Sequence, residues 1–263
     1  MSSEPVTNII TRLDLQQQLL ECGFKKGDIL EMHASIKAIG YILGGAQTLL
    51  DAIIDVIGIE GTLIMAAQVY DNSEPAFFEH PPIPVESYAS FRKHHPAFRN
   101  KLDNIRHMGE LARSMMIRPN SYMSEHPQDA FIAMGKYAKW ITQNHSLNSQ
   151  LGPDSPLGKM LELKSKLVLI GVNYDNATGM HLGEHLSGVR PFILQGSRVL
   201  VHGESQWVQF NGLDYDSDDF IKPGELLEKR GLVQFSSLGK AEVKIFNLSD
   251  ATDVVIEYFR STL

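Results

Sequence analysis

Apolar side chains follow a helical repeat in some segments of the chain and run without interruption in others. In segment 46–57, Leu49 and Ile53 fall on one stripe at helical spacing, which predicts an amphipathic helix. Segments 28–33 (DILEMH) and 61–68 (GTLIMAAQ), on either side of it, have the apolar character of buried strands. A strand–helix–strand succession of this kind predicts an α/β protein with a largely buried sheet.

The same patterns predict further elements along the chain. Thr11 and Asp14 form a capping signal ahead of a helix over 11–22, and Gly23 ends it. An almost continuously apolar segment, 166–173, predicts another buried strand. The remaining expected elements are helices near 109–117, near 136–144, from about 155 and over 250–260, a hairpin over 197–210 that turns at Gly203–Glu204, and a strand over 241–246.

The segment from about 69 to 104 has no such pattern. It contains five prolines, and a loop of this length inside a compact domain is usually functional. The chain shows no internal repeat, low-complexity tract or linker, which favours one domain over 1–263. We therefore expect a single α/β domain with a central, largely buried sheet flanked by helices and a C-terminal β-hairpin region. Segment 69–104 is the expected irregular, substrate-side part.

Composition narrows the functional class. The chain has 263 residues and a formal net charge of −7, which argues against a nucleic-acid partner. An acidic surface suits a cationic small molecule, although acidity for solubility alone is common. Cys22 is the single cysteine, so no intramolecular disulfide is expected. With no signal-peptide pattern and no membrane-length apolar run, we expect a cytoplasmic protein without a membrane partner; the oligomeric state is not indicated.

The motif at 181–185, His-x-x-Glu-His, is open to three interpretations. His181 and His185 share one helical face with Glu184 between them, as in inverted zinc peptidases. A zinc site of this kind also needs a third ligand and a long helix, and Gly183 weakens the helix here. The second interpretation is acid–base chemistry for group transfer, and the third is a solvated helix surface.

The transfer interpretation uses only part of the motif. Glu184 lies one helical turn from His181, so it can fix the imidazole tautomer and stabilise the protonated ring. Asp175, after the strand over 166–173, is a second possible orienting carboxylate. No G-x-S-x-G elbow is present and Cys22 falls in an amphipathic helix, so direct transfer with His181 as general base is the simpler scheme.

Two other features are open to a functional and a plain structural interpretation. Gly44 and Gly45 precede a predicted helix, where free backbone N–H groups can receive an anion, although such pairs also form ordinary turns. The acidic segment 212–220 (GLDYDSDDF) suits either recognition of a cation or a solvated loop.

Taken together, these segments resemble the aminoglycoside 3-N-acetyltransferase family. Segment 27–68 is similar to the family's His-Ser-Ser-Leu, Ile-Gly, Gly-Gly and Glu-Gly-Thr-Leu pattern. Two later segments match the family pattern in the same order and spacing: RHMGELARSM and SEHPQDAFIAMGKYAKWIT. A further segment is similar to the family's Leu-Leu-Gly-Val and Asp-x-x-Thr-x-x-His-Leu-x-Glu motifs: LVLIGVNYDNATGMHLGEH. The resemblance spans nearly the whole chain. It implies acetyl transfer from acetyl-coenzyme A to the 3-amino group of a 2-deoxystreptamine aminoglycoside, without a metal, and hence antibiotic resistance.

The resemblance also assigns residues. It places the catalytic histidine at His181 with Glu184 beside it, and His33, Asp175 and Thr178 on motif positions that line the active site. It places the coenzyme A side at Ser35, Ile36, Gly44, Gly45, Arg106, Ser155 and Leu157. The acidic residues expected to attract the cationic acceptor are Asp71, Asp214 and Asp216.

The chain departs from the family pattern at four places. Ala34 stands where the family has a serine hydroxyl, and Ala177 stands where it commonly has a side-chain amide. MAAQ at 65–68 replaces the usual Met-Pro-Thr, and Met123 stands where an arginine is common. These changes retain the expected base and affect positions expected near coenzyme or acceptor. They make a non-catalytic relative that binds coenzyme A or a cation one alternative to acetyl transfer. A zinc hydrolase that uses His181, Glu184 and His185 is the other.

Overall fold

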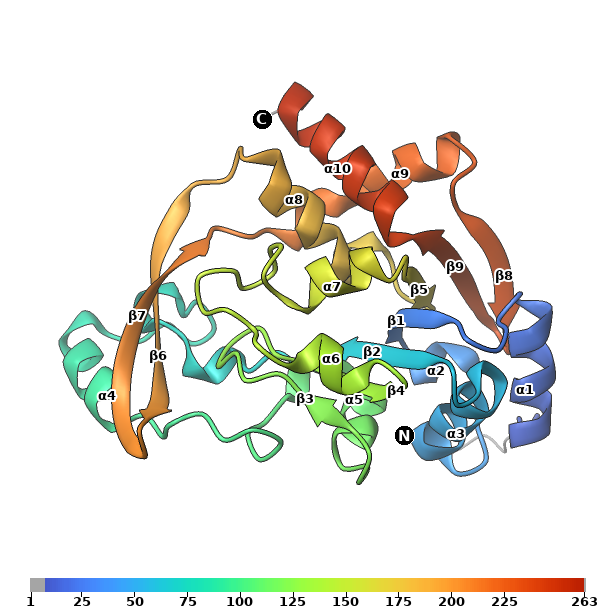
Figure 1. The fold of residues 1–263 in the computed structure, drawn as a ribbon, viewed down its shortest axis with the longest axis horizontal. Helices are drawn as coiled ribbons and strands as arrows, with labels where there is room; N and C mark the ends of the chain where they lie inside the picture. Colours follow the sequence, from blue (N-terminus) through green and yellow to red (C-terminus); the bar gives the residue numbers. More distant parts are fainter. Residues whose placement is uncertain (1–7, 263) are drawn as a thin grey trace.

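The three apolar segments expected as strands lie side by side at the centre of a seven-stranded sheet (Figure 1). The computed structural model describes residues 8–262, apart from the side chain of Arg106. The central strands β2 (Thr62–Ala66), β1 (Ile29–Ala34) and β5 (Lys166–Ile170) run parallel, in that order. Their carboxyl ends therefore meet at one edge of the sheet.

The helix expected between the first two strands makes the crossover that their parallel pairing needs. This helix, α3 (Gly45–Ile57), buries Leu49, Leu50 and Ile53 completely. It packs against α1 (Arg12–Glu21), where Thr11 and Asp14 form the expected capping box. The expected α/β architecture, with helices flanking a central sheet, is confirmed.

Antiparallel strands extend the sheet on both sides of its parallel centre. Its order is β3-β4-β2-β1-β5-β9-β8, in which β3 (Tyr122–Met123), β4 (Phe131–Gly135), β9 (Ala241–Asn247) and β8 (Gln234–Leu238) are antiparallel to their neighbours. Of these, only β9 was expected from the sequence. The apolar run of β4 is five residues long, and a run this short does not distinguish a strand from a helix.

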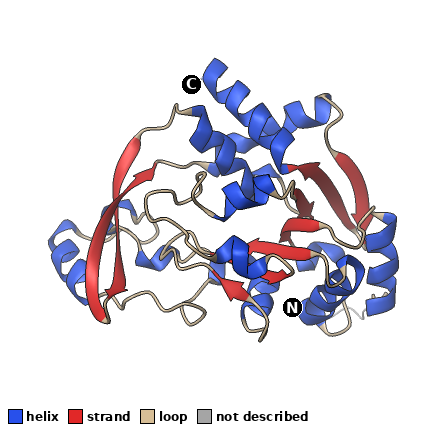
Figure 2. Cartoon of the chain, viewed as in Figure 1, coloured by secondary structure: helices blue, strands red, loops and turns tan. Residues whose placement is uncertain are grey.

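Helices cover both faces of the sheet (Figure 2). On one face, side chains of α1, α3 and α5 (Gly109–Met116) pack against alternate residues of the central strands, such as Leu30 and Val168. On the other, the core includes Leu167 and Phe246 together with side chains of later helices. The remaining helices are α2 (Ile36–Ile39), α4 (Tyr88–His94), α6 (Ala138–Thr142), α7 (Pro156–Glu162), α8 (His181–Ser187), α9 (Ile221–Lys229) and α10 (Leu248–Thr262).

The expected C-terminal hairpin forms a separate two-stranded sheet. Its strands, β6 (Phe192–Val201) and β7 (Glu204–Leu213), are longer than expected, and the turn lies at His202–Gly203. The hairpin stands beside segment 69–104, which contains α4 and short 3-10 helices (Figure 1). The amide Nδ2 of Asn72 donates to the carbonyl oxygen of Arg198 at 2.9 Å, which joins the two parts. Among the helices over 8–262, none has both the length and the apolar character needed to cross a membrane.

Candidate active site

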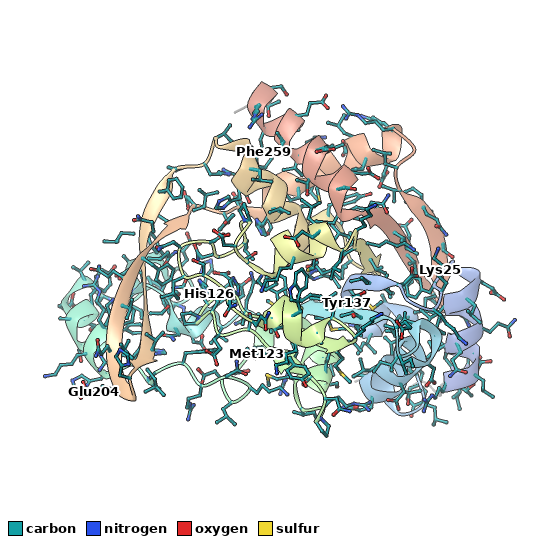
Figure 3. All side chains as sticks on the ribbon, in the orientation of Figure 1. Lys25, Met123, His126, Tyr137, Glu204 and Phe259 are labelled. Carbon is teal, nitrogen blue, oxygen red and sulfur yellow. The ribbon has the colours of Figure 1, made fainter. Side chains whose placement is uncertain are left out.

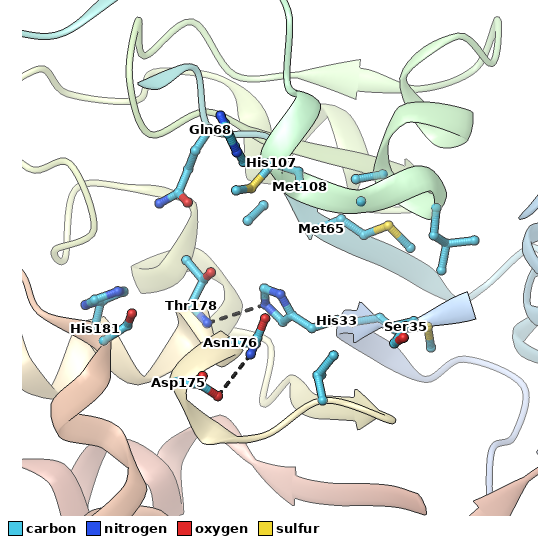
Figure 4. Close-up of a pocket in the computed structure, with 18 of the residues that line it drawn as sticks. His33, Ser35, Met65, Gln68, His107, Met108, Asp175, Asn176, Thr178 and His181 are labelled. Carbon is cyan, nitrogen blue, oxygen red and sulfur yellow. Dashed lines mark hydrogen bonds between the residues drawn. The ribbon is translucent and has the colours of Figure 1, made fainter. Parts of the chain in front are cut away.

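A cavity of about 360 Å³ lies at the carboxyl ends of the parallel strands (Figure 4). Ligands of open α/β sheets bind in this position because the loops that leave the strands surround it. The cavity wall is formed by the ends of β1 and β2 with the residues that follow them, the loop after β5, α5 and the two residues before it, the first residue of α8, and the short 3-10 helix Ser217–Phe220. The lining residues are Met32, His33, Ala34, Ser35, Met65, Ala66, Gln68, Tyr70, His107, Met108, Gly109, Leu111, Ala112, Val172, Asp175, Asn176, Thr178, His181 and Ser217.

His181, the first residue of α8, forms a tight pair with Glu184. Nδ1 of His181 lies 2.5 Å from Oε2 of Glu184, and the two side chains are almost completely buried. Because they are three residues apart on a helix, the backbone alone brings them together. Hydrogen bonds among the described residues leave Nε2 of His181 unengaged, and the ring lines the cavity.

Glu184 is held by groups from outside its helix. Its Oε1 accepts from Nε of Arg190 at 2.7 Å and from the backbone N–H of Asp216 at 3.1 Å. Arg190 also pairs with Asp219. A buried carboxylate is stable when it is paired and fully hydrogen-bonded, and these contacts meet that condition. They also fix the carboxylate against the imidazole of His181.

Aromatic rings complete the surroundings of His181. The edges of Tyr215 and Phe220 approach its ring, with centroids 5.1 Å and 4.6 Å away. Burial raises the pKa of the Tyr215 hydroxyl, and the nearby carboxylate of Asp129 adds to this effect. Tyr215 therefore stays neutral and can both donate and accept a hydrogen bond.

His33 and Thr178 lie on the same cavity wall. Nε2 of His33 is 3.1 Å from Oε1 of Glu31, and the backbone N–H of Thr178 points at the same ring nitrogen from 3.4 Å. In Figure 4, Thr178 lies between His33 and His181. Two of the three histidines that line the cavity, His33 and His181, thus each lie beside a buried carboxylate.

Asp175 lines the cavity but does not contact His181. Its exposed carboxylate accepts from Nδ2 of the neighbouring Asn176 at 2.9 Å. Of the two candidate orienting carboxylates, the structure therefore pairs Glu184 with the imidazole and leaves Asp175 at the rim.

The residues expected on the coenzyme side separate into distinct places. Ser35 lines the cavity, and Ile36 begins α2 directly after it. Gly44 and Gly45, both with positive φ, stand at the N-terminus of α3 and line a different groove, of about 480 Å³, on the other side of α5. The side chain of Arg106 lies outside the described residues.

Ser155 and Leu157 are not among the residues that line either of these two hollows, and their place on the coenzyme side stays a prediction. Both are fully buried. Oγ of Ser155 accepts from the backbone N–H of Leu157 at 3.1 Å and caps α7. Leu157 packs in the core beneath the sheet. Their side chains therefore hold α7 in place in this structure.

The three candidate acidic residues have different surroundings. Asp214 and Asp216 are exposed on the segment after β7, beside the cavity residue Ser217. Asp216 also accepts from the backbone N–H of Asp218 at 3.0 Å and so caps a short helix. Asp71 is half-buried in segment 69–104.

His185 contacts a neighbouring side chain of the protein and does not line the cavity. Its Nδ1 lies 2.8 Å from the hydroxyl of Tyr215, and burial lowers its pKa. Gly183 is the point at which α10 packs on α8, because a Cβ there would lie 2.7 Å from the carbonyl oxygen of Thr252. Over residues 8–262, no three His, Cys, Asp or Glu side chains are grouped to hold a metal ion. The geometry therefore does not support the zinc interpretation.

The structure adds polar residues that the sequence did not single out. Gln68 lines the cavity, and its Nε2 donates to Asp129 at 3.2 Å while its Oε1 accepts from the hydroxyl of Tyr70 at 2.6 Å. Nε2 of Gln150 donates to the second oxygen of Asp129 at 2.8 Å. Burial raises the pKa of Asp129, which Gln150 and the nearby His145 and His181 partly oppose. No local signal marks the contacts of Gln68 and Gln150 with Asp129, because these residues are far apart in the chain.

A buried histidine pair lies behind this network. His126, labelled in Figure 3, is completely buried, and its ring lies 4.7 Å from the ring of His145. Nδ1 of His126 accepts from the backbone N–H of Asp129 at 2.9 Å, and Nε2 of His145 contacts the carbonyl oxygen of Gln150 at 2.7 Å. Burial lowers the pKa of His126 to about 4 and that of His145 to about 3.

Comparison with known proteins shows that this chain is similar to acetyltransferases. A family model described as aminoglycoside 3-N-acetyltransferase matches residues 32–260. An aminoglycoside N(3')-acetyltransferase-like protein, YokD of Bacillus subtilis, is 31% identical over 250 residues, which cover 95% of this chain and 92% of that protein. Aminoglycoside N(3)-acetyltransferase IX of Micromonospora chalcea is 27% identical and matches 97% of this chain and 95% of its own.

Solved structures agree with these relatives. The crystal structure of YokD superimposes with a TM-score of 0.95 at 30% identity and covers 98% of this chain and 96% of that one. The aminoglycoside acetyltransferase AAC(3)-Xa superimposes with a TM-score of 0.89 at 26% identity, over 97% of this chain and 94% of its own.

Proposed function

The chain belongs to the aminoglycoside 3-N-acetyltransferase family, a family of acetyl-coenzyme A-dependent acyltransferases, and on this premise we propose its reaction and mechanism. The proposed reaction moves the acetyl group of acetyl-coenzyme A to the 3-amino group of a 2-deoxystreptamine aminoglycoside. The observation that carries it is the buried His181–Glu184 pair: Nδ1 of the imidazole is engaged by the carboxylate, Nε2 has no partner among the described residues, and His181 lines the cavity.

His181 acts as the general base. The acceptor amine arrives protonated and must lose a proton before its lone pair can attack the thioester carbonyl. Nε2 of His181 takes that proton, and the carboxylate of Glu184 at Nδ1 stabilises the imidazolium that results. Arg190 and the backbone of Asp216 keep the carboxylate in place during this step.

Attack forms a C–N bond and a tetrahedral oxyanion, and collapse of the oxyanion breaks the C–S bond. Thr178, between the two histidines on the cavity wall, supplies a hydroxyl that can donate to the oxyanion. The cavity, at about 360 Å³, lies in the volume range of small-molecule sites, so the reacting ends of both substrates fit it.

Charge at the rim favours a polycationic acceptor. Asp175 lines the cavity, and Asp214 and Asp216 are exposed on the adjoining segment. Carboxylates around a cleft raise the local concentration of a cationic substrate and its rate of association. We assign these residues to the acceptor side and Ser35 and Ile36 to the coenzyme side.

A thiol-release assay tests the proposal. The purified protein is incubated with acetyl-coenzyme A and a panel of 2-deoxystreptamine aminoglycosides, with simple primary amines as the control. We expect acceptor-dependent release of coenzyme A thiol, and nuclear magnetic resonance of the product locates the acetyl group. Binding of coenzyme A or aminoglycoside without thiol release would overturn acetyl transfer and favour a non-catalytic binding protein.

A further inference from the structure

Glu31 is a buried carboxylate that the mechanism above does not use. It is fully buried in the middle of β1, where its neighbours across the sheet are the apolar residues Ile64 and Leu167. One oxygen, Oε1, contacts His33, and the other, Oε2, has no hydrogen-bond partner. An apolar side chain would suit this position better, because burying a carboxylate costs free energy unless it is paired.

The single ion pair of Glu31 within the described residues is with His33. The two residues are two apart on a strand, so their side chains project from the same face of the sheet. A Cβ on Gly179 would lie 2.4 Å from Oε2 of Glu31, so the glycine makes room for the carboxylate beneath the loop that carries Thr178. The carboxylate therefore lies directly behind the cavity wall.

The two contacts of Nε2 favour one tautomer of His33. Nε2 is 3.1 Å from a carboxylate oxygen and 3.4 Å from the N–H of Thr178, which is long for a hydrogen bond. The contact with the carboxylate is the stronger one, and it requires a proton on Nε2. Nδ1 is then unprotonated, hydrogen bonds among the described residues leave it free, and the His33 side chain lines the cavity.

We propose that Glu31 is a positioning residue that holds His33 with Nε2–H toward the carboxylate and Nδ1 toward the cavity, as a second proton acceptor beside His181. The inference rests on the proposed acetyl transfer. It extends that mechanism because the reaction must move two protons from the acceptor nitrogen.

The proton balance shows what each imidazole contributes. A protonated amine and acetyl-coenzyme A give an amide, free coenzyme A thiol and one proton. His181 removes the first proton before attack and later releases it to solvent. After the C–N bond forms, the nitrogen is cationic again, and Nδ1 of His33 takes its second proton. As the C–S bond breaks, the imidazolium of His33 gives that proton to the departing sulfur.

The Glu31→Gln and Glu31→Met variants test the inference, and Asp28→Asn is the matched control. Asp28 is a buried carboxylate just before the same strand, but it pairs with Nζ of Lys166 at 3.0 Å and does not line the cavity. We expect kcat to fall about tenfold or more in both Glu31 variants, with the KM for acceptor changed less than about threefold. Asp28→Asn should keep kcat within about threefold.

Thermal unfolding separates positioning from a structural role. Replacing a buried charge by an apolar group of similar volume is often neutral or stabilising. The Tm of Glu31→Met should therefore stay level or rise while its kcat falls. If the Tm and kcat of Glu31→Met fall in proportion, or if kcat is unchanged, Glu31 has no positioning role.

A measurement without substrates keeps this inference separate from the proposed function. Nitrogen-15 NMR of the histidine rings, with His33→Gln used for assignment, reports the tautomer directly. We expect the Nε2–H form of His33 in the wild type and a shift toward Nδ1–H in Glu31→Gln. Unchanged tautomer populations overturn the inference even if acetyl transfer is demonstrated. The expected shift together with no thiol release from wild type would overturn the proposed function instead.

Discussion

Nδ1 of His181 and Oε2 of Glu184 are 2.5 Å apart in a buried pair, and Arg190 holds the other oxygen of the carboxylate. The arrangement leaves one imidazole nitrogen for a substrate and commits the other to the protein. An exposed helix surface would not bury both groups or add an arginine behind them.

His181→Ala should lower turnover by at least about a hundredfold, because the reaction loses its general base. The measurement is kcat from coenzyme A thiol release. Calorimetric titration with coenzyme A serves as the control, and its affinity should be retained. Near-wild-type kinetics in a folded variant would mean that another group removes the proton.

Glu184→Gln should lower kcat about tenfold or more, because the amide cannot stabilise the imidazolium of His181 as a carboxylate does. Arg190→Gln is the companion variant. It removes a hydrogen bond to a charged group and should reduce the free energy of unfolding by about 1.5–3 kcal/mol, with a smaller loss of kcat. An Arg190 variant as slow as Glu184→Gln would show that the arginine itself takes part in the reaction.

His185→Gln should keep turnover within about threefold, since His185 contacts Tyr215 rather than the cavity. Treatment of the wild type with a chelator should likewise leave the rate of thiol release unchanged. Stoichiometric zinc in the purified protein, together with loss of activity in the chelator, would restore the metal interpretation of 181–185.

The buried pair of His126 and His145 should make the fold sensitive to acid. Their lowered pKa values, about 4 and about 3, keep both rings neutral in the folded protein, whereas unfolded histidine takes a proton below pH about 6.5. Their contribution to stability is therefore complete above pH about 6.5. It falls as the pH drops toward 4, by up to about 1.4 kcal/mol per pH unit for each ring.

Urea unfolding between pH 4 and 7 measures this dependence. His145→Gln removes one titrating ring and should make the fall in unfolding free energy shallower. His202→Gln, at the exposed tip of the hairpin, is the control and should leave the slope unchanged. Equal slopes in all three proteins would show that other groups dominate acid unfolding.

Asp214→Asn should raise the KM for a polycationic acceptor with little change in kcat, because an exposed rim carboxylate acts on association. The difference from wild type should shrink as salt is added. Asp253→Asn removes the same charge from the exposed face of α10 and is the control. A KM that rises equally in both variants would point to net charge rather than to this site.

Several features followed from the sequence because they depend on neighbours in the chain. The capping box of Thr11 and Asp14, the apolar stripe of α3 and the pairing of His181 with Glu184 all join residues within one or two helical turns. The continuous apolar character of β5 likewise marked it as a buried strand. Backbone geometry and local periodicity are sufficient for predictions of this kind.

Other features required partners that are distant in the chain. β4 is a strand because it pairs with β2, and Gln68 contacts Asp129 from 61 residues away. Ser155 caps α7 from a fully buried position, and this burial depends on how α7 packs against the core. No local pattern encodes such contacts.

The sequence by itself determined the three central strands of the sheet, the family resemblance and the pairing of His181 with Glu184. Only the tertiary structure decided that Asp175 lies at the rim of the cavity without contacting His181, and that a buried Glu31 stands behind His33. The physical reason is the distance along the chain that separates the interacting residues. Helix and strand periodicities order side chains along a few residues, whereas the burial and charge of a site arise when separate elements pack together.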